Sequence, residues 1–449
     1  MSRPIPIGYA LANLPRYTSY PTAPHFGPLG EAEYRGWLAG IRPEDPLSLY
    51  LHIPFCRSLC WYCGCHTSVT RSADRVSRYG AALLKEAALL AAALPAHAGV
   101  ASLHLGGGTP STLGAAGLRS LLAGLRATFG FRPDAELAIE LDPRVLDEEI
   151  VAAMAEGGIT RASFGVQDIE PAVQRRIGRI QTEEVVARGV GWLRAAGIQG
   201  INLDLMYGLP GQTVAHVAAS VRFATALCAD RVAVFGYAHV PWMKPHQNAI
   251  HTEDLPGALE RLQQAETAEG VLVAAGYQAI GLDHFARPDD SMAIAARDGT
   301  LRRNFQGYTT DAAPVLLGMG ASSIGGIEGS EFAQGGYAQN EPNERRWVAA
   351  VEAGELPIRR GRAVTAEDRL RRHCIERVMC DFALDLTALP PALVAGLRPA
   401  LAPLESDGIL DLTPDLLRVT AAGRRHVRHV AACFDAYLGT GTGRHSAAV

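Results

Sequence analysis

HIPFCRSLCWYCGC, the stretch from His52 to Cys65, holds four of the eight cysteines in this 449-residue chain. Its first three cysteines have the spacing C-x3-C-x2-C. Thiolates are ligands for zinc and for iron–sulfur clusters. A structural zinc site takes four ligands, usually as two separated pairs, and no second Cys/His pair of that spacing follows in the sequence. Three thiolates from one loop therefore favour a cubane iron–sulfur cluster with one iron left open for chemistry.

The spacing resembles the signature of the radical S-adenosylmethionine (SAM) enzymes, in which three cysteines hold a 4Fe-4S cluster and the open iron binds SAM. Within them, HIPFC-x3-C-x-Y-C-G-C resembles the oxygen-independent coproporphyrinogen III oxidases, also called coproporphyrinogen dehydrogenases. Further matches are RYTSYPT (16–22), GGGTP (106–110), GVQD (165–168), DLMYGLP (204–210) and DHFARP (283–288). The resemblance therefore extends along the whole chain.

The bulk composition is that of a globular protein, with 48% hydrophobic and 20% charged residues. A net charge of −4 gives no electrostatic argument for a nucleic-acid partner. No secretory signal pattern is present, and no apolar stretch is long enough to span a bilayer. Clustered thiols with metal-binding spacing suit a reducing compartment. We expect a soluble, cytoplasmic protein with no nucleic-acid or membrane partner.

Arginine supplies nearly all of the positive charge, because Lys85 and Lys244 are the only lysines. Coding bias explains this composition. Alternatively, the arginines serve substrate binding. A guanidinium group can donate two parallel hydrogen bonds to one carboxylate, which suits a substrate that bears propionates.

From residue 48 onward, short apolar runs alternate with helical patterns. The expected strands are 48–54, 102–106, 136–142, 160–166, 201–207 and 231–239. The expected helices are 79–94, 113–129, 146–156, 183–196 and 214–226, with helix starts marked by Ser111, Thr182 and Thr213. Six strand–helix units predict a parallel sheet with right-handed crossovers. Periodicity leaves open whether the α/β sheet is doubly wound or a partial TIM-like barrel, and the resemblance favours a partial (β/α)6 barrel of the radical SAM type.

Four segments are expected in the chain. They are an N-terminal arm (1–45), the radical SAM partial barrel (46–245), a barrel extension (246–355) and a mostly helical, winged-helix-like C-terminal domain (356–449). In the last of these, 359–365 is interpreted as a basic linker and 366–381 as an amphipathic helix. The basic runs 359–372 and 424–428 invite a DNA-binding interpretation, but the domain lacks a basic stripe interleaved with aromatic residues. Covering the barrel mouth is the favoured role.

Polar or glycine-rich clusters follow nearly every expected strand. They lie at His52/Cys56, 106–109, Glu140/Asp142, Gln167/Asp168, Asp204 and Tyr237/His239. In parallel α/β folds, binding sites lie at the carboxyl edge of the sheet. The clusters therefore predict one shared site at the barrel mouth. Within it, the glycines of GGGTP leave backbone N–H groups able to face a ligand.

The spacing assigns Cys56, Cys60 and Cys63 as cluster ligands. The resemblance leaves Cys65 outside the ligand set, and a buried small residue is the alternative for it. The resemblance also implies contacts to a cluster-bound SAM from Tyr50, Gly107, Glu140 and Ile324. For a second SAM nearby, it implies contacts from Tyr62, Gly108, Thr109, Gln167, Arg179, Asp204 and Ala238.

The chemistry of these side chains suits their implied roles. Carboxylates can accept hydrogen bonds from ribose hydroxyls and the SAM ammonium, and Arg179 can bind the SAM carboxylate. As isolated residues, Glu140 and Asp204 could equally cap helices or form structural ion pairs, but their places at strand ends favour function. His52, His239 and His284 are proton donors or hydrogen-bonded scaffold. No catalytic residue is expected beyond the cluster and SAM.

By resemblance, the reduced cluster cleaves SAM to a 5′-deoxyadenosyl radical, which removes a hydrogen from the β-carbon of a propionate. Loss of carbon dioxide and one further electron leaves a vinyl group. A second propionate reacts likewise, so coproporphyrinogen III becomes protoporphyrinogen IX, a step of heme biosynthesis that requires oxygen-free conditions. The implied partners are an electron donor such as flavodoxin or ferredoxin and an electron acceptor, and we expect a monomer.

Two alternatives remain. One is a heme-binding chaperone of the same superfamily, although such relatives usually lack both the Cys-Gly-Cys ending and the 16–22 arm. The other is a radical SAM enzyme that acts on another tetrapyrrole.

Overall fold

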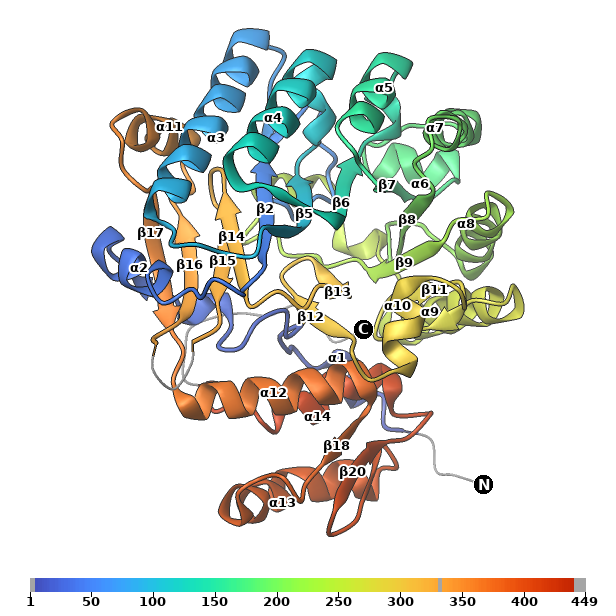
Figure 1. Cartoon of the computed structure of the whole chain (residues 1–449). Coiled ribbons are helices and arrows are strands. Elements are labelled where there is room, and N and C mark those ends of the chain that lie inside the picture. The colour runs from blue at the N-terminus through green and yellow to red at the C-terminus, as the bar shows by residue number, and fades with distance from the viewer. Residues whose placement is uncertain (1–4, 330–332, 440–449) are drawn as a thin grey trace.

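The computed structural model describes residues 5–329 and 333–439, and a curved sheet of thirteen strands among them forms the body of the molecule (Figure 1). Seven neighbouring strands are parallel. In spatial order they are β14 (Val315–Met319), β2 (Leu47–Ile53), β5 (Val100–Gly107), β6 (Phe131–Leu141), β7 (Arg161–Gln167), β8 (Gly200–Tyr207) and β9 (Arg231–Gly236). All six expected strands are therefore confirmed, with shifted ends.

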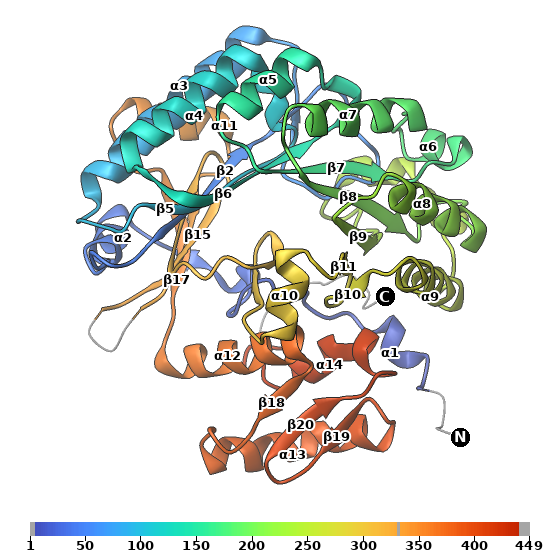
Figure 2. The same ribbon diagram turned by 45° about the vertical axis from the view of Figure 1, so that its right-hand side comes forward.

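The helices that follow these strands cover the convex side of the sheet (Figures 1 and 2). They are α3 (Ala73–Ala93), α4 (Gly114–Phe129), α5 (Glu148–Glu156), α6 (Pro171–Arg176), α7 (Glu183–Ala195) and α8 (Val214–Ala226). A doubly wound sheet would carry helices on both faces, whereas the concave side here looks toward α12 (Ala366–Asp381) (Figure 2). The expected partial barrel is confirmed.

Burial explains why these segments form strands and helices. Six of the seven residues of β2 are buried, as in a strand covered on both faces. In α3, Val76, Leu83 and Leu90 repeat at the spacing of one helix face and are buried in the main core. No helix in the described part of the chain is both long enough and apolar enough to cross a membrane.

The three expected helix caps have different outcomes. The Thr213 side chain accepts a hydrogen bond from the backbone N–H of His216 and completes a capping box, so this expectation is confirmed. Thr182 occupies the N-cap of α7 without a side-chain hydrogen bond. Ser111 does not cap α4, because it lies inside a 3-10 turn (Pro110–Leu113) that precedes this helix.

Antiparallel strands extend the parallel sheet at both edges. Beyond β14 they are β15 (Ile324–Ile327), β16 (Gly336–Asn340), β17 (Ile358–Ala363) and β1 (Gly27–Pro28); beyond β9 they are β11 (His284–Ala286) and β10 (Gln278–Ala279). The expected basic linker at 359–365 is therefore wrong. Most of it is β17, because this segment pairs with β16 on one side and with β1 of the arm, far away in the sequence, on the other.

Helices and a hairpin connect these edge strands. They are α9 (Ala258–Ala274), α10 (Ser291–Arg297), β12 (Arg302–Asn304), β13 (Gly307–Thr309) and α11 (Glu344–Glu352). The outermost strands, β1 and β10, do not pair with each other within the described residues, so the barrel stays open.

The C-terminal region has its own core and lies below the open side of the barrel (Figure 2). Its elements are α12, β18 (Ala383–Asp385), α13 (Pro391–Ser406), β19 (Leu410–Leu412), β20 (Leu416–Val419) and α14 (Val427–Ala432). Tyr17 and Tyr20 of the arm belong to this second core, while α2 (Glu31–Leu38) packs in the main one; α1 (Gly8–Leu11) precedes them. The division into four domains stays a prediction.

Candidate active site

The loop with the candidate cluster ligands leaves the carboxyl end of β2. It begins with β3 (Phe55–Cys56), which pairs in parallel with β4 (Ser68–Val69) where the loop returns. Segment 244–247 holds the loop from the opposite side. Lys244, His246 and Gln247 form hydrogen bonds of 2.8–2.9 Å with the carbonyl oxygens of Cys65, Cys63 and Tyr62. The positions of the cysteines are therefore fixed by backbone contacts on both sides of the loop.

The GGGTP loop after β5 lies against the cluster loop. The backbone N–H groups of Gly108 and Thr109 donate to the carbonyl oxygens of Ile53 and Phe55, each at 2.8 Å. A Cβ at Gly108 would lie 2.7 Å from the backbone carbonyl oxygen of Phe55. The two loops can therefore lie this close only because residue 108 is glycine. The expectation that these two N–H groups face a ligand is wrong, because they bind the cluster loop instead.

The three candidate cluster ligands are free thiols. The Cys60 sulfur lies 3.5 Å from Arg179 Nη1 and 3.6 Å from Arg144 Nη2, so two cationic side chains border it. Within the described residues, no three His, Cys, Asp or Glu side chains converge on one metal ion. In a 4Fe-4S cluster each cysteine binds a different iron, so its ligands need not meet at one point. The donor set therefore fits a cluster better than a single ion.

Cys65 lies beside this ligand set. It is exposed, so the alternative of a buried small residue is wrong. A hydrogen bond from Cys65 lowers the pKa of the Cys63 thiol to about 6.

Arg179 is the centre of a buried charge network next to Cys60. Its guanidinium lies 3.3 Å from Asp142, which also binds Arg144 at 2.6 Å, and it donates to the Gly165 carbonyl oxygen. Burial raises the pKa of Asp142, but the two arginines outweigh it and leave that pKa below its usual value. The buried Nε of Arg179 has no hydrogen-bond partner in the structure. One donor of this arginine is therefore available to a bound group.

The structure places Gln167 and Tyr62 beside Arg179. A Cβ at Gly165 would meet the Gln167 amide at 2.8 Å and the Arg179 guanidinium at 3.4 Å, so both side chains lie over this glycine. Gln167 has a left-handed backbone, with φ of 69°. Burial raises the pKa of Tyr62 well above its usual value, and the nearby Arg179 charge opposes this shift.

Three of the four residues implied for the first SAM lie together on β2, β5 and β6. Glu140 accepts hydrogen bonds from the Gly107 N–H at 3.1 Å and from His104 Nε2 at 3.0 Å. A Cβ at Gly106 would lie 3.1 Å from the Tyr50 ring and 2.8 Å from Glu140. Burial raises the pKa of Glu140, but the His104 and Gly107 contacts prevail and hold that pKa below its usual value.

Ile324 stands apart from these three residues. It begins β15, two strands away from β2, and its backbone lies against Gly318, the residue that pairs with Tyr50.

Asp204 and Ala238 lie farther around the barrel. Asp204 accepts hydrogen bonds from Ser163 Oγ at 2.9 Å and from Asn202 Nδ2 at 2.8 Å. Burial raises the pKa of Asp204 to about 6. Ala238 follows β9, where its carbonyl oxygen accepts a hydrogen bond from Gln247. The residues implied for the second SAM thus extend along the carboxyl edge from the cluster loop after β2, which holds Tyr62, to Ala238 after β9.

The three histidines have different environments. His52 is scaffold, because Nδ1 lies 3.1 Å from Tyr50 Oη and Nε2 lies 2.8 Å from the His66 carbonyl oxygen. His239 Nδ1 is 2.9 Å from Tyr237 Oη. His284 Nδ1 is 2.6 Å from a carboxylate oxygen of Asp283.

Sequence reasoning missed several contacts of the site. His104 orients Glu140, and Arg144 shares Asp142 with Arg179. The contact between Arg144 and Asp142 has a local signal in the sequence, because Asp142-Pro143-Arg144 directly follows a strand. Lys244 was also identifiable, as one of only two lysines in the chain. His104 sits in a strand among apolar residues, and nothing in its neighbourhood marks its role.

Comparison with known proteins agrees with this geometry. The model of the radical SAM superfamily matches residues 50–224. An oxygen-independent coproporphyrinogen III oxidase of Bradyrhizobium diazoefficiens is 47% identical, with all of both chains covered. The one of Paracoccus denitrificans is 44% identical, over 99% of this chain and 98% of that protein.

A solved structure extends the similarity to the fold. The coproporphyrinogen III oxidase of Escherichia coli, described as a radical SAM enzyme, superimposes with a TM-score of 0.89 at 40% identity, over 94% of this chain and 97% of its own. Identity over nearly full length, the shared fold and the placement of the cysteines agree. The chain belongs to the oxygen-independent coproporphyrinogen III oxidase family of the radical SAM superfamily.

Proposed function

We propose that this enzyme converts two propionate side chains of coproporphyrinogen III to vinyl groups and releases protoporphyrinogen IX. The observation that carries the proposal is the placement of three free thiols at the carboxyl edge of the barrel, next to buried arginines and carboxylates, in a chain that matches named oxidases along its full length. Each conversion removes one hydrogen atom from the β-carbon of a propionate, and it releases the carboxylate as carbon dioxide together with one electron. An electron acceptor must therefore take part.

The cofactors of this family are a 4Fe-4S cluster and SAM, which supply the radical chemistry when bound. We assign Cys56, Cys60 and Cys63 to the cluster. Tyr50, Gly107, Glu140 and Ile324 are assigned to a first SAM. Glu140 is held ionised by His104 and the Gly107 N–H, so it can accept hydrogen bonds from hydroxyl or ammonium groups.

A second SAM is the finer part of the proposal. Its assigned contacts are Tyr62, Gly108, Thr109, Gln167, Arg179, Asp204 and Ala238. The unpartnered Nε of Arg179 supports a bound carboxylate there. Gly108 and Thr109 can offer carbonyl or side-chain atoms, since their N–H groups are already engaged.

The remaining assignments concern partners and surroundings. We propose that a flavodoxin or ferredoxin reduces the cluster, that the chain acts as a monomer in the cytoplasm, and that neither nucleic acid nor a membrane takes part. Segment 244–247 then serves to position the cluster loop.

The test is an anaerobic turnover assay. The reconstituted, reduced enzyme is given SAM and coproporphyrinogen III, and carbon dioxide and vinyl products are followed, with Cys60→Ala as the control. Stepwise decarboxylation that disappears in the variant is expected. SAM cleavage without decarboxylation would instead indicate another tetrapyrrole substrate. Tight heme binding with neither activity would indicate a chaperone.

A further inference from the structure

A groove of about 590 Å³ runs beside the cluster loop, between the first halves of α3 and α4. These helices are neighbours on the convex side of the sheet (Figures 1 and 2). Small side chains leave the space open, because the lining residues of the two helices include Ala73, Gly80, Ala81, Gly114, Ala116 and Gly117. The cluster loop completes the lining with Arg57 and Arg71.

The two arginines lie on adjacent segments of the cluster loop. The backbone N–H of Thr70 donates to the Cys56 carbonyl oxygen at 3.1 Å, and each arginine directly follows one partner of this bond. Both arginines are exposed. Cys56 is an assigned cluster ligand, so the groove begins one residue away from the cluster.

The surface beside the cluster loop is cationic, although the chain as a whole carries a net charge of −4. Residues 46–73 contain no Asp or Glu. The described residues that line the groove likewise include no carboxylate, and Asp74, which follows the loop, is not among them. An anionic surface therefore complements Arg57 and Arg71.

Exposed apolar side chains adjoin this charge. Leu59, Trp61 and Val69 of the cluster loop are 37%, 39% and 46% exposed. The Trp61 ring packs on Gly178, where a Cβ would lie 3.2 Å from it. Exposed apolar surface bordered by polar residues marks sites of protein contact, and small interfaces serve transient electron-transfer encounters. The surface therefore fits an acidic protein better than a small anion.

We propose that an acidic one-electron carrier protein docks on Arg57, Arg71 and the groove, and delivers its electron to the cluster at the Cys56 side of the loop. The inference rests on the proposed function, because reductive cleavage of SAM requires an electron donor. Each cleavage oxidises the carrier by one electron. The SAM sulfonium is reduced to the thioether of methionine as the bond to the 5′-deoxyadenosyl radical breaks. Electron transfer slows steeply with distance, so a donor must approach the loop that holds the ligands.

Exposed charges at this place act mainly on the rate of encounter. Complementary charge raises association rate constants by about 10- to 1000-fold, and salt screens the effect. Reversing the charge of Arg57 or Arg71 should therefore slow association most strongly at low salt. The apolar Leu59 should instead affect dissociation. These two signatures separate charge steering from a general loss of structure.

The test measures association of oxidised flavodoxin with the reconstituted full-length protein at several salt concentrations. Arg57→Glu and Arg71→Glu should each lower the association rate constant by about 10-fold at low salt, with a smaller effect at high salt. Arg222→Glu is the matched control, because it makes the same charge change at an exposed position on α8. It should associate as the wild type does. Leu59→Ala should mainly raise the dissociation rate constant.

A parallel measurement compares two reductants. Reduced flavodoxin depends on docking, whereas photoreduced 5-deazariboflavin is a small molecule that does not. SAM cleavage by Arg71→Glu should fall with flavodoxin and match the wild type with the photoreductant. Because Arg57 is next to an assigned ligand, iron content is measured for every variant. If Arg57→Glu loses iron, Arg71→Glu decides.

The possible outcomes separate the explanations. Wild-type association of flavodoxin with both charge variants would overturn the inference, and so would a wild type that binds neither flavodoxin nor ferredoxin. Equal losses of SAM cleavage with both reductants would show that the arginines support the loop instead. Duplex DNA binding that Arg71→Glu abolishes, with flavodoxin binding unchanged, would give the surface to nucleic acid. Failure to decarboxylate coproporphyrinogen III, with arginine-dependent docking and SAM cleavage intact, would overturn only the proposed reaction.

Discussion

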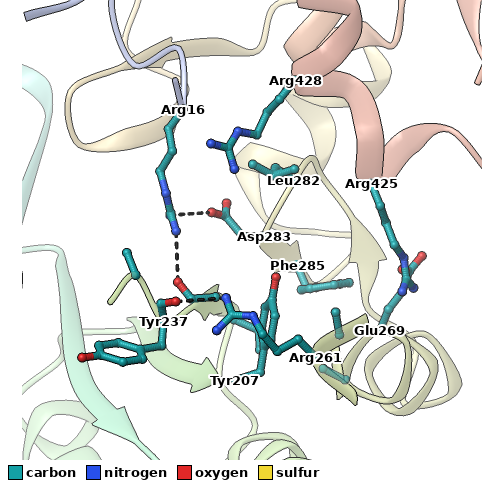
Figure 3. A pocket seen from close by; sticks show the side chains of 15 residues that line it. Arg16, Tyr207, Tyr237, Arg261, Glu269, Leu282, Asp283, Phe285, Arg425 and Arg428 are labelled. Carbon is teal, nitrogen blue, oxygen red and sulfur yellow. Dashed lines mark hydrogen bonds and ion pairs between the residues drawn. The ribbon is translucent and has the colours of Figure 1, made fainter. Parts of the chain in front are cut away.

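The two halves of the barrel mouth assemble their arginines from different parts of the chain. In the cluster half, formed by β2, β5, β6 and β7, Arg144 and Arg179 share Asp142 and lie beside a cysteine thiol. In the far half, formed by β8, β9 and β11, the arginines outnumber the carboxylates around the cavity of Figure 3. The cluster half thus draws its arginines from two loops that follow neighbouring strands, whereas the far half draws Arg16, Arg261 and Arg428 from the arm, α9 and the C-terminal region. The first arrangement depends on local sequence and the second on how distant parts of the chain pack together.

The largest effect is expected from the cluster ligands themselves. Cys63→Ala should lose the bound iron and all turnover, because it removes one of three thiolate ligands. Cys65→Ala should keep both, since Cys65 lies outside the assigned set although it is only two residues away. Iron content and the visible absorption of the reconstituted proteins measure this difference. Equal iron loss in both variants would mean that Cys65 is a ligand.

Next in size is the removal of a carboxylate from each half. Asp142→Asn should cost about 3–5 kcal/mol of unfolding free energy, because two buried arginines lose their shared partner. Asp283→Asn should cost less, about 1–3 kcal/mol, because the side chain of its partner Arg16 is 35% exposed. Denaturant unfolding of the unloaded proteins measures both. An equal or reversed order would show that the exposure of the arginine partners does not set the cost.

Asp204 lies on β8 of the far half and accepts a hydrogen bond from Ser163 on β7 of the cluster half. The pH dependence that it gives to stability has a definite sign. Its folded-state pKa is about 6, above the usual 3.8, mainly through burial. The folded protein therefore binds the proton more tightly, and stability falls as pH rises from about 4 to 6. Asp204→Asn should accordingly be more stable than the wild type at pH 8, by about 3 kcal/mol, with the difference vanishing near pH 4.

Thermal or urea unfolding across this pH range measures the effect. Ser163→Ala is a matched control, because it removes a hydrogen-bond donor to Asp204 and should steepen the pH dependence instead of abolishing it. Weaker SAM binding in Asp204→Asn, despite higher stability, would separate a functional carboxylate from a structural one. A variant that is destabilised equally at every pH would show that the hydrogen bonds matter more than the charge.

The same division separates what the sequence predicts from what it does not. The cluster half follows from local signals: cysteine spacing, apolar strands, and polar residues at strand ends. The far half depends on Arg16, Arg261 and Arg428, which lie hundreds of residues apart and have no common local pattern. In the same way, β17 was interpreted as a basic linker, because strand pairing with the arm is a long-range property. The sequence also does not predict that the N–H groups of Gly108 and Thr109 are hydrogen-bonded within the protein, because their acceptors lie on another loop.

The smallest expected effect on the free energy of unfolding comes from adding a Cβ at Gly108 or at Gly236. The first glycine lies against backbone atoms and the second against the ends of side chains. A Cβ at Gly108 would lie 2.7 Å from the Phe55 carbonyl oxygen and 2.9 Å from the Pro54 carbonyl carbon, both backbone atoms of the cluster loop. A Cβ at Gly236 would lie 2.8 Å from Tyr207 Oη and 3.3 Å from Arg261 Nη2, the ends of side chains. Backbone cannot yield without moving the loop, whereas side-chain ends can rotate.

Gly108→Ala should therefore cost about 1–3 kcal/mol and lower the iron content after reconstitution, while Gly236→Ala should cost under about 1 kcal/mol. Gly191→Ala is the control for both, because its new Cβ meets no atom within 4 Å. Unfolding curves and iron content distinguish the three. Gly236→Ala should keep the iron content of the wild type, because Gly236 lies outside the cluster loop. Iron loss in that variant would instead show that the two halves are mechanically coupled.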